Sequence, residues 1–230
     1  MQPQNLMVRL AVQTALTALL MGAVLFGAAG GWNWPQGWAW LALFTVGSAG
    51  FGLWLRRHDP ALLASRLSSP VQQGQPLGDR LFFLAAIPLW FGWLALMALD
   101  ARRWHWSRIL PWLNGVGAAL VVLGFLGVLR VFAENSFAAP VVRVQAERAQ
   151  TVIDTGPYAR VRHPMYVAGL LYVAGLPLLL GSWLGLACVP VLLLGLCWRI
   201  GLEERTLQRD LPGYDAYMRK VRWRLMPGIW

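Results

Sequence analysis

Charged residues are scarce in this sequence. Only 13% of its 230 residues are Asp, Glu, Lys or Arg, whereas 57% are hydrophobic. Soluble globular domains carry about 25% charged residues, because they must cover their surface with groups that water solvates. The shortage of charge therefore argues against a soluble domain and indicates a protein that is largely surrounded by lipid.

Cysteine and histidine are also few. Both cysteines, Cys188 and Cys197, fall in the last hydrophobic run, so they form neither a disulfide framework nor a spaced metal site. His58 and His105 lie in separate loops, which we place on opposite sides of the membrane. Because neither the cysteines nor the histidines are grouped, we expect no metal centre. A glycine-rich phosphate loop and a nucleophile elbow are absent as well.

Acidic residues number only 10 against 20 basic ones, which gives a net charge of +10. In a soluble protein that balance would indicate a nucleic-acid partner. Here most cations flank hydrophobic runs, and no basic stripe is interleaved with aromatic residues that would stack on bases. We therefore expect membrane lipids, and not nucleic acid, as partners. The sequence leaves the oligomeric state open.

Hydrophobic runs make up most of the chain. Several approach or exceed 18 residues, which is enough to cross a bilayer core of about 30 Å at about 1.5 Å per residue. The first run could be a signal peptide, but it is longer than the usual hydrophobic region of one, so we keep it as a membrane helix. The runs are residues 8–29, 38–55, 81–99, 110–132, 164–180 and 183–201.

These runs predict an all-α integral membrane protein with about six transmembrane helices and a cytoplasmic, amphipathic C-terminal segment. Residues 1–133 would supply about four of the helices. Residues 134–230 would form the catalytic core, made of a loop, a transmembrane hairpin and the segment 202–230. The whole chain would be one membrane domain.

Two connections between the runs carry local signals. Asp59-Pro60 reads as an N-cap followed by proline at the first helical position, which predicts a short helix to about Leu67. Residues 68–78 are rich in Ser, Pro, Gln and Gly and are expected to form a loop. The connection 133–163 is longer than about 15 residues and is not of low complexity, so we expect it to be functional.

The basic residues set the expected orientation. If the N-terminus lies in the cytoplasm, the cytoplasmic segments hold 17 of the 20 Lys and Arg residues, as the positive-inside rule requires. Tryptophans gather in the opposite turns, as in an interfacial aromatic belt. The long connection and the C-terminal segment then share the cytoplasmic face, so we predict a multi-pass protein whose active site faces the cytoplasm.

A cluster of functional residue types marks the start of the fifth run. Pro164 suits the first position of a helix, whose free N–H groups and dipole attract an anion. Arg162 and His163 add positive potential there, and Tyr166 could donate a hydrogen bond to the same ligand. The simpler alternative is a set of basic residues that flank a membrane helix, with proline as its start signal.

A second cluster follows the sixth run. Arg199 and Glu203 are four residues apart on a helix, so they could simply pair with each other. However, Glu203 and Glu204 are adjacent acids where a helix leaves lipid, and ionisable groups at membrane depth tend to be functional. Carboxylates would accept hydrogen bonds from ribose hydroxyls or an ammonium group and would favour a nearby sulfonium cation.

Three tyrosines are expected on the same side of the membrane. Tyr158, Tyr214 and Tyr217 have amphipathic rings, which would either anchor the protein at the membrane interface or contact a ligand.

Taken together, these motifs resemble the isoprenylcysteine carboxyl methyltransferase family. Phospholipid N-methyltransferases share the Arg-His-Pro motif, a following tyrosine and a later Glu-Glu pair. The similarity covers roughly residues 130–230, and the preceding part is similar only as membrane helices. It rests on Gly156-Pro157-Tyr158, Arg162-His163-Pro164-Met165-Tyr166, an apolar hairpin, Glu203-Glu204 and Leu211-Pro212-Gly213-Tyr214 through Tyr217.

The resemblance implies a methyltransferase that uses S-adenosylmethionine, bound at the cytosolic side. The acceptor would be lipophilic and enter from the bilayer, either the carboxylate of an isoprenylcysteine-like substrate or a lipid amine. The implied catalytic residues are Arg199, which would orient the acceptor, and Glu203 and Glu204. The implied cofactor-binding residues are Tyr158, Arg162, His163, Pro164, Tyr166, Glu203, Glu204, Tyr214 and Tyr217.

Two other functions remain open at this stage. Membrane sterol reductases resemble this family in their C-terminal half and use NADPH, for whose phosphates Arg143 and Arg160 could supply cations. A non-enzymatic membrane scaffold or transporter is the other alternative. A transporter should carry ionisable groups in the middle of its helices, and we find none there, which weakens that reading.

Overall fold

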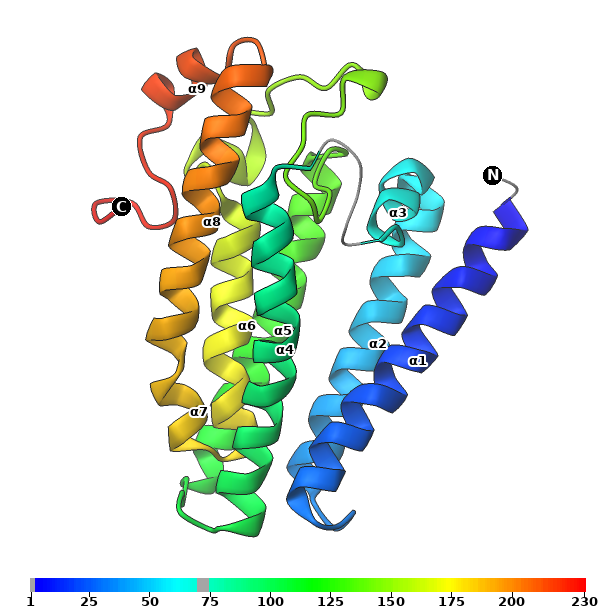
Figure 1. The fold of residues 1–230 in the computed structure, drawn as a ribbon, viewed down its shortest axis with the longest axis vertical. Helices are drawn as coiled ribbons and strands as arrows, with labels where there is room; N and C mark the ends of the chain where they lie inside the picture. Colours follow the sequence, from blue (N-terminus) through cyan, green and yellow to red (C-terminus); the bar gives the residue numbers. More distant parts are fainter. Residues whose placement is uncertain (1–2, 70–74) are drawn as a thin grey trace.

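The computed structural model describes residues 3–69 and 75–230, and these are all-helical, with no strand (Figure 1). The all-α prediction is therefore confirmed. The helices are α1 (Pro3–Ala29), α2 (Pro35–His58), α3 (Pro60–Arg66), α4 (Leu77–Ala98), α5 (Pro111–Glu134), α6 (Pro164–Leu180), α7 (Trp183–Ala187), α8 (Val189–Asp210) and α9 (Tyr214–Lys220). A π-helical turn, Leu99–Arg103, follows α4, and short 3-10 turns cover Ala146–Arg148 and Gly156–Ala159.

Five helical stretches within the described residues are long and apolar enough to cross a membrane, and they follow five of the six predicted runs. The remaining run is α6, which at 17 residues is shorter than these. It contacts α4, α5 and α8 and buries residues such as Ala168, Gly175 and Leu176 among them. The prediction of about six transmembrane helices thus becomes five long helices and one short, central one.

The structure corrects two predicted boundaries. The C-terminal tail was expected to begin at Leu202, but α8 continues to Asp210, because residues 202–210 are mostly good helix formers and the first breaker is Pro212-Gly213. The predicted loop 68–78 was too long at its end, since α4 begins at Leu77 and therefore contains Asp79. Residues 70–74 of that loop lie outside the described residues.

At other helix starts, the structure shows the local capping features expected of these residues. Pro35 and Pro164 each occupy the start of a helix, α2 and α6 respectively. Asp59 caps α3 as predicted, because its Oδ1 accepts a hydrogen bond from the backbone N–H of Leu62 at 2.8 Å. α4 runs through Pro88 as one continuous helix.

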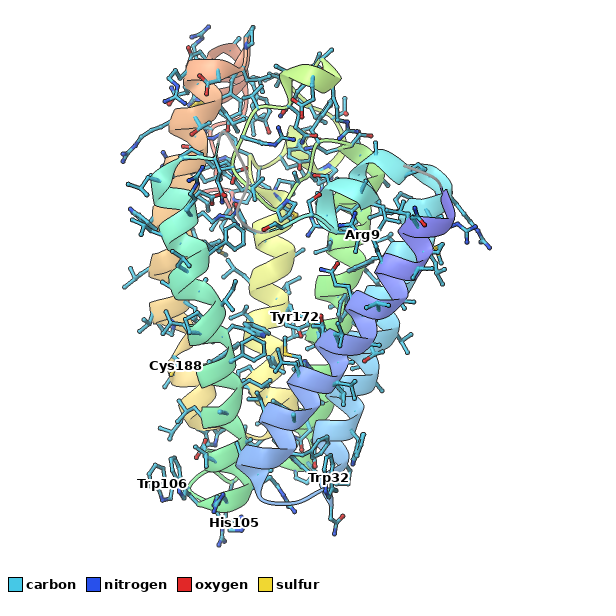
Figure 2. All side chains as sticks on the ribbon, turned by 45° about the vertical axis from the view of Figure 1, so that its right-hand side comes forward. Arg9, Trp32, His105, Trp106, Tyr172 and Cys188 are labelled. Carbon is cyan, nitrogen blue, oxygen red and sulfur yellow. The ribbon has the colours of Figure 1, made fainter. Side chains whose placement is uncertain are left out.

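The helices form a bundle with two distinct ends. In Figure 1, α1 and α2 lie together beside the group α4, α5, α6 and α8, and α3 and α9 lie at the same end of the bundle as the N-terminus. We call this the loop end, because it also carries residues 135–163. Figure 2 shows Trp32 and Trp106 at the opposite end, where the predicted aromatic belt was placed. Between the two ends, Trp40 Nε1 donates to the hydroxyl of Tyr172 at 2.9 Å and so links α2 to α6.

Close packing of α5 on α6 depends on glycine. A Cβ on Gly117 would lie 2.6 Å from the carbonyl oxygen of Gly175, which is closer than real Cβ atoms approach. Small residues of this kind let membrane helices approach each other. Because α6 carries the first cluster of candidate functional residues at its start, this contact also positions the site.

We expect Gly117→Leu to lower the melting temperature of the protein in detergent. Overpacking of this kind typically costs about 1–3 kcal/mol. Gly115→Leu is the matched control, because a Cβ on Gly115 would have nothing within 4 Å. Equal melting curves for the two variants would show that the α5–α6 contact tolerates a side chain at residue 117.

Candidate functional site

The start of α6 is fixed by the C-terminal segment. The backbone N–H of Arg162 donates to the carbonyl of Trp223 at 2.9 Å, and that of His163 donates to the carbonyl of Arg224 at 3.0 Å. α6 then begins at Pro164. Two stretches about 60 residues apart in the chain are therefore held side by side at the loop end.

Glu204 is the centre of a buried charged cluster. Its Oε1 accepts from Arg162 Nε at 2.7 Å and lies 3.1 Å from His163 Nε2, while its Oε2 accepts from Arg224 Nε at 2.8 Å. Only 3% of the Glu204 surface is exposed. The cluster at the start of α6 and the adjacent acids of α8 are thus in direct contact through Glu204.

Arg224 was missed at the sequence level, where it counted only toward membrane orientation. Arg162 is tied further to the same segment, because its Nη1 donates to the carbonyls of Val221 and Arg222 at 2.9 and 2.8 Å. Charge-assisted bonds of this type are about twice as strong as neutral ones. Glu204 and Arg162 therefore join α8, the start of α6 and the C-terminal segment into one unit.

Glu203 has different surroundings from its neighbour. Its Oε2 accepts a hydrogen bond from the Tyr166 hydroxyl at 2.5 Å, and within the described residues it forms no ion pair and no other hydrogen bond. The side chain is partly exposed and lines a cleft. Of the two acids, Glu203 is the one that has no direct ion pair within the described residues, although its charge acts on Arg199, and it is the one that can reach a ligand in the cleft.

The cleft lies between the start of α6, α8, α9 and residues 135–153 of the long connection. Its interior volume is about 90 Å³. Three of the candidate residues, Pro164, Arg199 and Glu204, do not line it. The candidates that do are Tyr158, Arg162, His163, Tyr166, Glu203, Tyr214 and Tyr217.

The three tyrosines are packed inside the protein and are not exposed anchors. Tyr214 and Tyr217 are 4% and 5% exposed. The Tyr158 hydroxyl accepts from Asn135 Nδ2 at 2.8 Å, and the Tyr217 hydroxyl donates to the Tyr158 carbonyl at 2.9 Å. Burial raises the pKa of Tyr158 to about 12, so its hydroxyl stays protonated. The Tyr214 hydroxyl makes no hydrogen bond within the described residues, which leaves it available to a ligand.

Arg199 does not pair with Glu203, so the local i, i+4 pairing considered from the sequence is wrong. Its Nε lies 3.1 Å from Oδ1 of Asp79, and its Nη2 donates to the carbonyl of Pro140. The guanidinium also lies 4.9 Å from the ring centres of Phe82 and Phe83. The Glu203 charge still acts on Arg199 electrostatically, but the direct contact of the guanidinium is with Asp79 on α4.

Asp79 is a second residue that sequence reasoning missed. It is fully buried, and its Oδ2 accepts from the backbone N–H of Val142 at 2.9 Å and from Gln75 Nε2 at 2.7 Å. Val142 lines the cleft, so Asp79 holds one wall of it in place. An acid in the first turn of a helix that follows Pro76 was the available signal, but the turn had been assigned to a loop.

The cleft offers groups that fit the amino-acid part and the ribose of S-adenosylmethionine. Arg162 Nη2 and His163 Nδ1 make no hydrogen bond within the described residues, although the other nitrogens of both side chains are occupied. A guanidinium N–H suits a carboxylate, and a neutral imidazole with its proton on Nε2 can accept from an ammonium group. Glu203 can accept from ribose hydroxyls. The donor set therefore fits the cofactor that the resemblance implies.

Comparison with known proteins finds similarity in the part of the chain that contains most of the cleft residues. Residues 112–211, from the start of α5 to the residue after α8, match the family model for phospholipid methyltransferases. The nickel-cobalt-cadmium resistance protein NccN of Alcaligenes xylosoxydans xylosoxydans is 30% identical over 130 residues, which is 56% of this chain and 57% of NccN. The cobalt-zinc-cadmium resistance protein CzcN of Cupriavidus metallidurans is 29% identical over 130 residues, which is 56% of each chain. The chain thus matches little more than half the length of these relatives.

Proposed function

We propose, from the match of residues 112–211 to the family model for phospholipid methyltransferases, that the protein is an integral membrane methyltransferase. It transfers a methyl group from S-adenosylmethionine to a lipophilic acceptor, which is either the carboxylate of an isoprenylcysteine-like substrate or a lipid amine. The observation that carries the proposal is Glu203, an acid that makes no direct ion pair within the described residues and lines the cleft beside Arg162 and His163.

Each group in the cleft has a separate task in this proposal. Arg162 Nη2 holds the carboxylate at the amino-acid end of the cofactor, and His163 Nδ1 accepts from its ammonium group. Glu203 accepts from the ribose hydroxyls and favours the positive sulfonium. S-adenosylmethionine supplies a methyl carbon that the sulfonium activates. Glu204 and Arg199 act as positioning residues, because neither lines the cleft.

Methyl transfer is an in-line displacement, so the protein must mainly align the acceptor with the methyl carbon and exclude water. Such positioning supplies about 7–11 kcal/mol in well-oriented systems. A carboxylate acceptor is already a nucleophile and needs no base. An amine acceptor must lose a proton, for which Glu203 is the available base. The presence of Glu203 therefore does not distinguish a carboxylate acceptor from an amine acceptor.

The cleft must widen for this ligand. Its volume of about 90 Å³ is below the about 300 Å³ at which ligand pockets begin. Residues 140 and 142 are anchored by Arg199 and Asp79, whereas Asp154 is held by an exposed ion pair with Lys220 at 2.6 Å. We therefore place the movement in the outer part of the connection. We also place the loop end in the cytoplasm, because it carries 17 of the 20 basic residues.

Metal binding is not part of the proposal, although the names of the two relatives refer to metal resistance. Over residues 3–69 and 75–230, no group of three or more His, Cys, Asp or Glu side chains is arranged to hold a metal ion. The cluster around Glu204 is built from cations that already neutralise it.

Calorimetry in detergent tests the proposal. We expect saturable binding of S-adenosylhomocysteine and no binding of NADP. Glu203→Gln should weaken the binding by about tenfold or more, because a hydrogen bond to a charged group is worth about 1.5–3 kcal/mol. Asp210→Asn is the matched control, since Asp210 is an exposed acid on the same helix.

Two outcomes would contradict the assignment. Binding of NADP without S-adenosylhomocysteine would favour a reductase of the sterol type. Unchanged affinity in a folded Glu203→Gln variant would remove Glu203 from the site.

A further inference from the structure

A second cavity lies between α1, α2, α3 and α5, and its lining shares no residue with the cleft. Its volume is about 260 Å³, so it is larger than the cleft. Most of its lining is apolar, with Leu10, Phe44, Phe51, Val128 and Phe132 among the residues. Figure 1 shows α1 and α2 set to one side of the remaining long helices. Because α1, α2 and α5 are each long and apolar enough to cross a membrane, hydrocarbon chains are the expected occupants of a cavity between them.

Arg66 lies in the wall of this cavity at its loop end. Its guanidinium lies 4.6 Å from the ring centre of Phe132, and its Nη1 donates to the carbonyl of Ala138 at 2.7 Å. Burial, and then repulsion from Arg199, lower the pKa of Arg66 to about 10, so it remains a cation at neutral pH. Its Nε and Nη2 make no hydrogen bond within the described residues.

No acid within the described residues pairs with Arg66. The other arginines that are largely withdrawn from solvent differ in this respect, since Arg162 pairs with Glu204 and Arg199 with Asp79. A cation held among apolar groups without a counter-ion is costly. Charge complementarity at this point therefore calls for an anion, and the apolar space beside it calls for a hydrocarbon chain.

We propose that the cavity binds a long-chain carboxylate, with its hydrocarbon chain between α1, α2 and α5 and its carboxylate at Arg66. A carboxylate matches the planar fork of a guanidinium, which can hold both of its oxygens. Thr14, Thr17 and Ser48 line the same cavity and tolerate a polar substituent on the chain. The proposal does not require methyl transfer, because neither Arg66 nor these residues line the cleft, although Arg66 Nη1 contacts Ala138 and Met165, which do.

Photo-crosslinking of the full chain in zwitterionic nanodiscs tests this site. The probe is palmitate with a diazirine in mid-chain, and the labelled peptides are identified by mass spectrometry. We expect labels on α1, α2 and α5. Unlabelled palmitate should compete at least about tenfold better than methyl palmitate or hexadecyltrimethylammonium, which share the chain but lack the negative charge.

Two pairs of variants test separately the contact of the ligand carboxylate with Arg66 and the space for its hydrocarbon chain. Arg66→Gln should weaken labelling about tenfold or more, and Arg57→Gln, an exposed cation near the same end, should not. Ser48→Phe should abolish labelling by filling the cavity. Val46→Phe is its control, because Val46 is 72% exposed on the same helix.

The proposal fails if the three competitors act equally, since the cavity would then accept any membrane chain. Hexadecyl phosphate is tested as a further competitor, and the proposal also fails if it competes while palmitate does not, since the site would then select a phosphate. It fails as well if the Arg66→Gln variant is labelled like the unaltered protein. If Ser48→Phe does not fold, the competitor series and the Arg66 variant still decide the outcome.

Discussion

Replacing Glu204 with alanine is expected to lower the free energy of unfolding by about 3–5 kcal/mol and to release the C-terminal segment from the bundle. Removing one partner of a buried ion pair leaves the other charges uncompensated, and losses of that size follow. Here the change exposes Arg162 and Arg224 to each other's charge without an acid between them. The backbone pairing of residues 162–163 with 223–224 depends on the same contact.

Thermal unfolding in detergent measures the loss of stability, and proteolysis or hydrogen exchange over residues 221–230 measures the release. Asp210→Ala is the control, because Asp210 is an exposed acid at the end of the same helix. Glu204→Gln should lie between the two, since it keeps an acceptor but loses the charge. A Glu204→Ala protein that melts normally with residues 221–230 protected would contradict this account of the cluster.

Replacements of the two adjacent acids are thus expected to abolish cofactor binding for different reasons. Glu203→Gln should lose cofactor binding while the fold survives, because Glu203 faces the cleft. Glu204→Ala should lose cofactor binding because the start of α6 loses its support. The sequence grouped Glu203 and Glu204 as one pair, and adjacent residues on a helix point about 100° apart, so only tertiary packing decides which one reaches the ligand.

Much of the fold was accessible from the sequence because a membrane helix satisfies its own backbone and needs only an apolar surface. Long apolar runs therefore located α1, α2, α4, α5 and α8. Proline signals located the starts of α3 and α6. The boundaries failed where a helix extends beyond its apolar run, as α8 does, because its last residues are polar and hydropathy no longer marks them.

The pairing of charges within the site was not accessible in the same way. Sequence reasoning named His163 and Glu204 only as residues of one implied site, and the structure shows that their side chains are in contact. It considered only Glu203 as an ion-pair partner for Arg199, whereas the actual partner, Asp79, is 120 residues away in the chain. It had no reason to separate Arg224 from the other basic residues of the tail. Distant partners of this kind depend on how the helices pack, which composition and spacing do not determine.

Asp79 shows that the site extends beyond the residues that match the family. The match covers residues 112–211, whereas Asp79 lies on α4. Its carboxylate reaches Arg199 on α8 and the backbone of Val142 in the cleft wall. The N-terminal half of the protein therefore contributes to the geometry of the cleft, although the sequence suggested only membrane helices there.

We expect Asp79→Leu to lower the free energy of unfolding by about 3–5 kcal/mol, because it leaves Arg199 buried without a counter-ion and the N–H of Val142 without an acceptor. Adding Arg199→Met should recover part of that loss, since replacing both members of a buried pair by apolar residues is often nearly neutral. The coupling between the two sites should be about 0.5–3 kcal/mol in a double-mutant cycle measured by unfolding in mixed detergent and SDS micelles. Asp215→Leu is the control, because Asp215 is exposed. Strictly additive effects would mean that Asp79 stabilises the wall through Val142 alone.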